Sequence, residues 1–392
     1  MTGLEILLPP ELGPLVGLIL NRPDLQDELG ALDDADSFIG AALAISGRHD
    51  LEVPEAVLRS VLRPDPLGMG RFAAAPITLD CWPPCGWLPT RSVPTGGAPD
   101  LDWLWFGSRP LTAPFFEDDV RRARYLPINW LMRIRTSLAG LVADSERQES
   151  LPLKGLIFHM SRCGSTLAAQ MLAAVPAHAV SSEPEPLDAV LRWAVDSRIE
   201  AEQADAAIRA IVAALGRMRS PGQTSHFIKL EVWHTHYLPA LRRAFAQTNW
   251  VYLHRDPVEV LVSLIEQPSM HTLPGVAFHA QLEASYSADF TVQALAGYAR
   301  AVITNWGVGG GITLDYPAIV GAMPSTIAEH FELCLSDPDR AAMEQAGSRN
   351  AKAPSEVFAS DSERKRSAAG PDVRTAAEFW LDPIRQTLLA LQ

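Results

Sequence analysis

Residues 153–175, LKGLIFHMSRCGSTLAAQMLAAV, constrain the fold of this chain more than any other stretch. Residues 156–158 are a short apolar run typical of a buried strand, and good helix formers follow from Ser165 onward. The polar loop between them ends in Gly164, which lets the backbone approach a ligand closely. A strand, a tight loop and a helix N-terminus direct several N–H groups at one point, so the pattern predicts an anion site.

The loop departs from the common nucleotide-binding loop because its Gly-Lys pair is missing, and Arg162 comes before Cys163, Gly164, Ser165 and Thr166 instead. The order basic residue, any residue, Gly, Ser, Thr resembles the 5′-phosphosulfate loop of sulfotransferases that use 3′-phosphoadenosine 5′-phosphosulfate (PAPS). The resemblance implies that these five residues hold the phosphosulfate, with Arg162 at the bridging oxygen. An ordinary capped helix is the alternative interpretation.

A second motif occupies residues 249–264, NWVYLHRDPVEVLVSL. A strand-like run ends at Arg255, and Pro257 stands where the first turn of a helix tolerates proline. Ser263 follows Arg255 by eight positions, so a strand end and the following helix could bring both side chains to one phosphate. The spacing resembles the 3′-phosphate motif of the same family, and two such motifs in this order are more specific than either alone.

Further strands are expected over residues 179–182, 227–232 and 312–316, with helical segments between them. Strands that alternate with helices predict an α/β domain, a parallel sheet with helices on both faces and ligands at the carboxyl ends of the strands. Both motifs lie at such strand ends. The resemblance implies the P-loop-like sulfotransferase fold for residues 151–392, preceded by a mainly helical N-terminal region.

The general base is open to more than one assignment. Glu183 ends the second strand, where tyrosylprotein sulfotransferases and some bacterial relatives carry a glutamate base, so it is the first candidate. Lys229 matches a lysine of the cytosolic small-molecule sulfotransferases and is expected at the catalytic site. Their histidine base falls two residues later, at Glu231, and His234 is close but out of register. Either could replace Glu183, which would then only cap a turn or pair with an arginine.

The family closes the 3′-phosphate site with a basic C-terminal loop, and residues 347–366 are polar and basic at the corresponding place. Lys352 is the candidate ligand, with Arg364 or Lys365 behind it. A solvated loop is the alternative.

The front of the chain divides into two parts. Residues 1–63 show apolar spacing typical of helices and resemble a small helical domain found as the leader region of some bacterial ribosomal peptide precursors. If that resemblance holds, it implies a docking role for a peptide or protein partner. Residues 64–150 are rich in Pro and Trp; we expect a linker at 94–99 and a helix over 127–142. The predicted domains are therefore 1–63, 64–150 and 151–392.

Composition limits the partners. The net charge of −13 argues against nucleic acid, and any basic surface has to be local. Four cysteines in 392 residues are no disulfide framework, which favours a reducing cytoplasm. No signal peptide is evident, and the apolar run at 15–20 is too short to cross a bilayer, so no membrane is expected.

The sequence thus predicts an enzyme that moves a sulfuryl group in line from PAPS to a hydroxyl or amine of a small molecule or peptide, without a metal. One alternative is a kinase-like phosphotransferase, although the Gly-Lys pair and an acidic Mg²⁺ motif are missing from the sequence. The other is a non-catalytic binding protein that kept the nucleotide fold.

Overall fold

The computed structural model describes residues 8–64, 75–197, 199–273, 288–351, 353–357 and 361–391. Its contacts divide the chain into two compact units. The first unit consists of Met1–Leu151 and Pro184–Gln223, and the second of Pro152–Glu183 and Thr224–Gln392. The chain therefore leaves the second unit once, after Glu183, and returns to it at Thr224. The expected domain boundaries remain a prediction.

The second unit is built on a five-stranded sheet of order β6-β7-β5-β8-β9, in which every neighbouring pair is parallel. The strands are β5 (Leu153–His159), β6 (His178–Ser182), β7 (Ser225–Lys229), β8 (Asn249–His254) and β9 (Gly311–Asp315). Each of the five runs that the sequence marked as a strand is a strand of this sheet. β5 is central, and its residues 155–159 are buried, as a strand covered on both faces requires.

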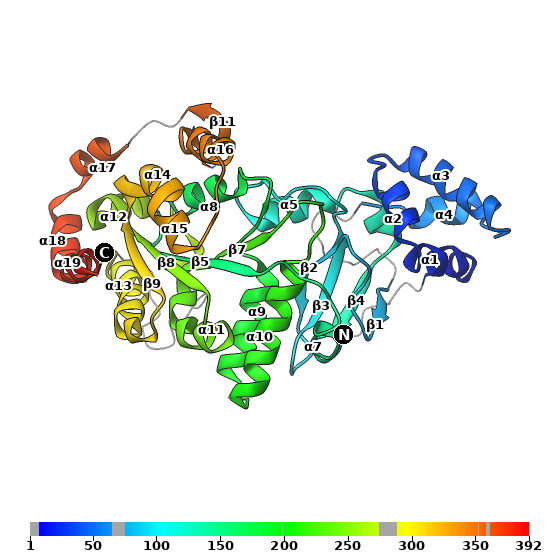
Figure 1. Ribbon diagram of the computed structural model, residues 1–392, viewed down its shortest axis with the longest axis horizontal. Helices are drawn as coiled ribbons and strands as arrows, with labels where there is room; N and C mark the ends of the chain where they lie inside the picture. Colours follow the sequence, from blue (N-terminus) through cyan, green and yellow to red (C-terminus); the bar gives the residue numbers. More distant parts are fainter. Residues whose placement is uncertain are drawn as a thin grey trace. The chain divides into compact units, whose positions relative to one another are not determined.

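Helices lie on both faces of this sheet, with α8, α14 and α16 on one side and α11 and α13 on the other (Figure 1). The α/β prediction with a parallel sheet is thus confirmed. The helices of the unit are α8 (Ser165–Ala173), α11 (Leu238–Ala244), α12 (Pro257–Glu266), α13 (Ala288–Thr304), α14 (Ile319–Ala322), α15 (Ala328–His330), α16 (Asp337–Gly347), α17 (Ser362–Ala368), α18 (Pro371–Trp380) and α19 (Asp382–Ala390). A small hairpin joins β10 (Arg349–Asn350) to β11 (Ala353–Val357).

The first unit begins with helices, as predicted: α1 (Gly13–Leu20), α2 (Pro23–Gly30), α3 (Ala35–Arg48) and α4 (Glu55–Val61). Asp34 caps α3 by accepting a hydrogen bond from the N–H of Ser37 at 2.8 Å. Gln26 is fully buried, and its amide donates to the carbonyl oxygen of Ile19 and accepts from the indole N–H of Trp87. The side chain of Gln26 on α2 is therefore hydrogen-bonded both to α1 and to Trp87 of the strands that follow.

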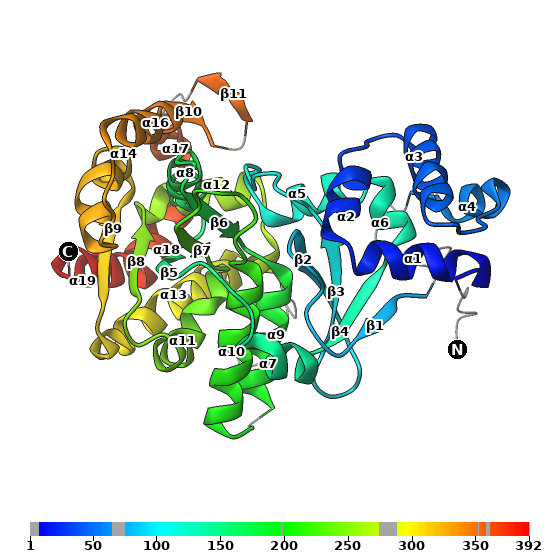
Figure 2. The ribbon, with the colours of Figure 1, turned by 45° about the vertical axis from the view of Figure 1, so that its right-hand side comes forward.

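Residues 77–137 contain a four-stranded sheet that the sequence did not predict, of order β1-β4-β3-β2. Its strands are β1 (Ile77–Leu79), β2 (Trp87–Val93), β3 (Asp100–Trp105) and β4 (Ile134–Ser137), with α1 to α4 grouped on one side of it (Figure 2). The expected linker at 94–99 is the turn between the paired strands β2 and β3.

The predicted helix over 127–142 is wrong. Two helices, α6 (Pro127–Leu131) and α7 (Leu138–Ser145), flank the strand β4. The side chains of β4 alternate, because Ile134 and Thr136 are buried while the residues between them are not, and the strand pairs with both β3 and β1. Pairing with strands distant in sequence outweighs a local helical preference.

Three more helices complete the first unit: α5 (Phe116–Ala123), α9 (Glu185–Asp196) and α10 (Ala201–Leu215). α9 packs on β2, and Arg217 after α10 donates hydrogen bonds to the carbonyl oxygens of Pro83 and Pro84. In the described part of the chain, no helix combines the length and apolar character needed to cross a membrane.

Candidate functional site

The loop after β5 has the backbone geometry of an anion cradle. Arg162 and Gly164 both have left-handed backbone angles, with φ of 57° and 84°. Alternation between left- and right-handed residues turns successive N–H groups to one side and forms a concave site for an anion. Helix α8 begins at the next residue, Ser165, so its N-terminus faces the same loop.

Gly164 is required here for two separate reasons. Its φ lies where side chains are strained, and an added Cβ would stand 2.7 Å from the ring of Tyr316 and 2.8 Å from Ile319. Tyr316 and Ile319 follow β9, so the end of that strand closes over the loop.

The side chain of Arg162 reaches across the loop, where its Nη2 donates to the carbonyl oxygen of Gln267 at 2.7 Å. Burial lowers the pKa of Arg162, although a guanidinium stays charged at neutral pH. A single hydrogen bond to a neutral carbonyl leaves most of its donors for another acceptor.

The remaining loop residues are buried. Cys163 is fully buried, and burial raises the pKa of its thiol to about 12, against the weaker opposing effects of Lys229 and Arg255. A thiol of this kind is inert at neutral pH. Ser165 and Thr166 are 6% and 8% exposed in the first turn of α8, where hydroxyl groups next to the helix N-terminus suit a phosphate.

Glu183 forms a buried ion pair with Lys229. The Lys229 Nζ lies 2.6 Å from Glu183 Oε1, and His159 Nε2 lies 3.4 Å from the same oxygen. Glu183 is held by its backbone as well, since its N–H donates to the carbonyl oxygen of Lys229 at 2.7 Å and its φ is 55°. His159 and Lys229 are the last residues of β5 and β7, and Glu183 directly follows β6, so the three residues lie at the carboxyl ends of neighbouring strands.

The pKa of Glu183 is lowered despite burial. Burial is the largest single influence and raises this pKa, but the charges and hydrogen bonds of Lys229 and His159 together outweigh burial and lower it to about 2. The carboxylate is therefore ionised throughout the neutral range.

The two other base candidates have a structural role. Glu231 and His234 form a capping box around the 3-10 turn Val232–Tyr237, in which the N–H of Glu231 donates to His234 Nδ1 at 3.2 Å. His234 is completely buried. Both residues remain predicted alternatives to Glu183 as the general base.

Arg255 is the centre of a charged cluster at the end of β8. It donates to Glu259 at 2.6 Å and to Asp361 at 3.0 Å, and its guanidinium lies 4.1 Å from the centre of the Tyr316 ring. Burial opposes its charge, but the hydrogen bonds to Asp361 and Glu259 outweigh burial and raise the pKa of Arg255. Its Nη1 also lies 3.4 Å from the carbonyl oxygen of Arg162. The two motifs of the sequence thus meet.

The other predicted ligands lie around this cluster or beyond it. Ser263 is half-buried on α12, two turns after Arg255. Lys365 on α17 pairs with Asp361 at 2.7 Å, whereas Arg364 pairs with Glu266 at 2.6 Å. Lys352 lies outside the described residues.

Sequence reasoning missed His159, Tyr316, Glu259 and Asp361. His159 is the last residue of a strand that carries the predicted loop, and Glu259 follows Arg255 by one helical turn, so both had a usable signal in the sequence. Tyr316 and Asp361 reach the site from distant parts of the chain, and no local sequence pattern predicts their position there.

The fold and the loop first define a class of protein, a parallel α/β domain whose central strand ends in a loop with the backbone geometry of an anion cradle. Residues 156–329 match the family model described as "Sulfotransferase family". The part of the chain that holds this loop and Arg255 is therefore similar to the sulfotransferase family, as the resemblance implied.

Comparisons with whole proteins add only distant matches. No curated protein matches the chain. Among solved structures, the sulfotransferase domain of the Synechococcus PCC 7002 olefin synthase is 16% identical, with a TM-score of 0.35, 60% of this chain covered and 96% of that one. Sulfotransferase STF1 of Mycobacterium tuberculosis H37Rv is 12% identical, with a TM-score of 0.40 and coverages of 68% and 86%. Mouse sulfotransferase SULT7A1, complexed with PAP, is 10% identical, with a TM-score of 0.36 and coverages of 64% and 93%.

Proposed function

We propose that this protein transfers a sulfuryl group from PAPS to a hydroxyl or amine acceptor. One observation carries the proposal: Arg255 Nη1 lies 3.4 Å from the carbonyl oxygen of Arg162. The loop that would hold the 5′-phosphosulfate therefore adjoins the arginine that would hold the 3′-phosphate, and both lie in one unit and within the residues that match the sulfotransferase family. A nucleotide with phosphates at both ends of its ribose needs two such anion sites side by side.

The donor would lie along the ends of β5 and β8. Residues 162–166 would hold the 5′-phosphosulfate through loop N–H groups and the hydroxyls of Ser165 and Thr166. Arg255 and Ser263 would hold the 3′-phosphate, together with Lys352. Because Arg255 now contacts Asp361, the phosphate would have to replace that carboxylate, and a phosphate accepts more hydrogen bonds in the fork geometry that arginine favours.

Glu183 would serve as the general base. As the acceptor oxygen or nitrogen forms its bond to sulfur and the bond from sulfur to the bridging oxygen breaks, Glu183 would take the acceptor proton. Arg162 would stabilise the negative charge that develops on the leaving 3′-phosphoadenosine 5′-phosphate (PAP). Lys229 keeps Glu183 ionised, and a weakly basic carboxylate suits a proton that is transferred late, after the acceptor has become more acidic.

The acceptor would be a small molecule or a peptide, and we place the reaction in the cytoplasm. All four cysteines have free thiols, which suits a reducing compartment. The helices of residues 8–61 are proposed as a docking element for a peptide or protein partner.

A turnover experiment tests the proposal. The full chain is incubated with PAPS and a panel of alcohols, phenols and amines, and the PAP released is measured by chromatography. We expect PAP release that depends on the acceptor, and a fall of about 100-fold or more in the Glu183→Gln variant. Asp188→Asn, a carboxylate of the first unit paired with Arg192, is the matched control and should retain full activity.

Three results would count against the proposal in different ways. Transfer from ATP with Mg²⁺, but not from PAPS, would favour a kinase-like phosphotransferase. Binding of PAP without any turnover would favour a non-catalytic protein. Full activity of Glu183→Gln would retain sulfuryl transfer but remove Glu183 as the base.

A further inference from the structure

His159, the last residue of β5, contacts the proposed base from a buried position. It is 4% exposed, and its Nε2 lies 2.8 Å from the carbonyl oxygen of Leu230 and 3.4 Å from Glu183 Oε1. Its other ring nitrogen, Nδ1, lies 3.1 Å from the carbonyl oxygen of Met160. Backbone carbonyl groups therefore contact the imidazole at both nitrogens and fix the orientation of the ring.

These contacts indicate which ring nitrogen carries a hydrogen. A carbonyl oxygen only accepts, so a nitrogen that faces one forms a hydrogen bond only when it is protonated. Nε2 makes the shorter of the two carbonyl contacts, and it also faces a second acceptor, the carboxylate of Glu183. The hydrogen therefore belongs on Nε2, which donates to the carbonyl oxygen of Leu230 and directs its N–H towards the side of Glu183.

Lys229 contacts the same oxygen of this carboxylate. Its Nζ lies 2.6 Å from Glu183 Oε1, so the lysine and the imidazole converge on one atom. An ammonium group on a flexible stem with rotatable donors fixes the orientation of a carboxylate poorly, whereas a planar ring that is held at both nitrogens fixes it well. Both side-chain contacts described for Glu183 are made by Oε1, so Oε2 is the oxygen that can take a further partner.

The backbone of Glu183 is fixed next to these side chains. Its φ of 55° lies in the left-handed region, which a residue with a side chain adopts only where its surroundings hold it, and such residues concentrate at functional sites. Its N–H donates to the carbonyl oxygen of Lys229, and the carbonyl oxygen of the next residue, Leu230, contacts His159. Two consecutive carbonyl groups thus set Glu183 and His159 relative to each other.

We propose that His159 is a positioning residue for the transfer: together with Lys229 it holds Oε1 of Glu183, so that Oε2 takes the acceptor proton. This inference rests on the proposed function. In the step, the acceptor oxygen or nitrogen bonds to sulfur, the bond from sulfur to the bridging oxygen breaks with its electron pair going to PAP, and the acceptor proton moves to Oε2. Because proton transfer needs a defined direction, loss of His159 lowers the rate and leaves the donor loop intact.

The variant His159→Leu tests this role. We expect its kcat, measured with radiolabelled PAPS and an accepted substrate, to fall about tenfold or more, because the orientation of the base is lost. The Kd for PAP, measured by calorimetry, should stay within about twofold of the wild type. His159→Gln keeps an N–H donor at this position and should recover most of kcat.

A cycle with Glu183→Gln shows whether His159 acts through Glu183. In the Glu183→Gln background, His159→Leu should lower the residual kcat by less than about twofold, because the residue that it positions has already lost its carboxylate. A merely structural role would lower kcat by the same factor in both backgrounds.

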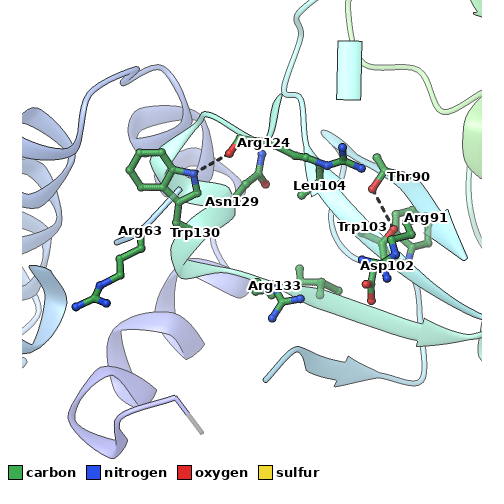
Figure 3. Close-up of a pocket in the computed structure, with 11 residues that line it drawn as sticks. Arg63, Thr90, Arg91, Asp102, Trp103, Leu104, Arg124, Asn129, Trp130 and Arg133 are labelled. Carbon is green, nitrogen blue, oxygen red and sulfur yellow. Dashed lines mark hydrogen bonds between the residues drawn. The ribbon is translucent and has the colours of Figure 1, made fainter. Parts of the chain in front are cut away.

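Two controls remove a contact between a ring nitrogen and a backbone carbonyl elsewhere. His178→Leu removes the contact of Nδ1 with the carbonyl oxygen of Leu172, at 3.0 Å, at the start of β6. Trp130→Phe removes the hydrogen bond of 2.7 Å from the indole N–H to the carbonyl oxygen of Arg124 in the first unit (Figure 3). Both variants should keep kcat within about twofold of the wild type.

A second measurement applies even if His159→Leu folds poorly. NMR of the full chain with isotope-labelled histidine should show that Nε2 of His159 carries a hydrogen. The Nε2 resonance should shift in Glu183→Gln, because the neighbouring carboxylate is lost, while the ring resonances of His178 should not.

The inference is overturned if the wild type turns over PAPS and His159→Leu keeps its kcat, or if the Nε2 resonance does not respond to Glu183→Gln. It is overturned as well if His159→Leu loses PAP affinity by the same factor as kcat, or loses the same factor in the Glu183→Gln background, because His159 would then only support the fold. These results leave the proposed function intact, whereas a wild-type chain without turnover of PAPS with any acceptor would overturn both.

Discussion

The buried pair of Glu183 and Lys229 gives a prediction that can be worked out from the structure. Lys229 is 1% exposed, and its Nζ lies 2.6 Å from Glu183 Oε1. The pKa of Glu183 falls from 4.5 to about 2, and because one pKa unit corresponds to about 1.4 kcal/mol, the surroundings favour its charged form by about 3 kcal/mol. Either Glu183→Gln or Lys229→Met leaves the other charge buried, so each should lower the free energy of unfolding by about 3 kcal/mol.

A double-mutant cycle isolates the pair. Because the double variant leaves neither charge behind, it should lose less than the sum of the single losses, with a coupling free energy of at least about 1.5 kcal/mol. Urea denaturation followed by hydrogen exchange of peptides from β5 and β7 measures the second unit directly. Losses that add to within about 0.5 kcal/mol would refute the reasoning, because Glu183 and Lys229 would then be independent.

Three further predictions follow from named contacts. Gly164→Ala should lower the melting temperature and weaken PAP binding at least about tenfold, because the added Cβ would lie 2.7 Å from the Tyr316 ring. A PAP affinity that calorimetry finds unchanged in this variant would contradict the prediction. Iodoacetamide at pH 8 should alkylate the exposed Cys81, Cys85 and Cys334 but not Cys163, because burial raises the pKa of the Cys163 thiol to about 12. Detection of labelled Cys163 in the folded chain by mass spectrometry would contradict this prediction. Burial lowers the pKa of His254 from 6.5 to about 4, so the unfolded chain takes up this proton at a higher pH than the folded chain, and the free energy of unfolding should fall by on the order of 3 kcal/mol as the pH drops from 6.5 to 4. The urea midpoint should therefore fall more steeply with decreasing pH in the wild type than in His254→Gln, and equal pH dependence of the two midpoints would argue against this prediction.

The sheet of the second unit could be predicted because local signals and the tertiary structure agree there. The runs at 156–158 and 250–253 are apolar, short and followed by a loop and a helix, and both are central buried strands in the structure. The anion loop could be located for the same reason, since Arg162, Gly164 and Ser165 are consecutive or nearly so.

The rest of the site depends on partners that local patterns do not report. Asp361 contacts Arg255 across 106 positions, and Tyr316 closes over Gly164 from the end of another strand. The sheet of residues 77–137 was not predicted because β4 pairs with β1 and β3, which lie far from it in the sequence. Its four residues between two helices are also too few to show the alternating pattern that distinguishes a strand from a helix.

The proposed function requires that the second unit binds PAPS through separate 5′ and 3′ anion sites. The most direct measurement is calorimetric titration of the full chain with PAP, ADP and ATP, repeated with Arg255→Ala and with Arg242→Ala, an arginine of the same unit that donates to the carbonyl oxygen of Thr248, as the control. We predict that PAP binds at least about 100-fold more tightly than ADP, and that Arg255→Ala alone removes this preference. Equal binding of PAP and ADP, or a preference that survives in Arg255→Ala, would contradict it.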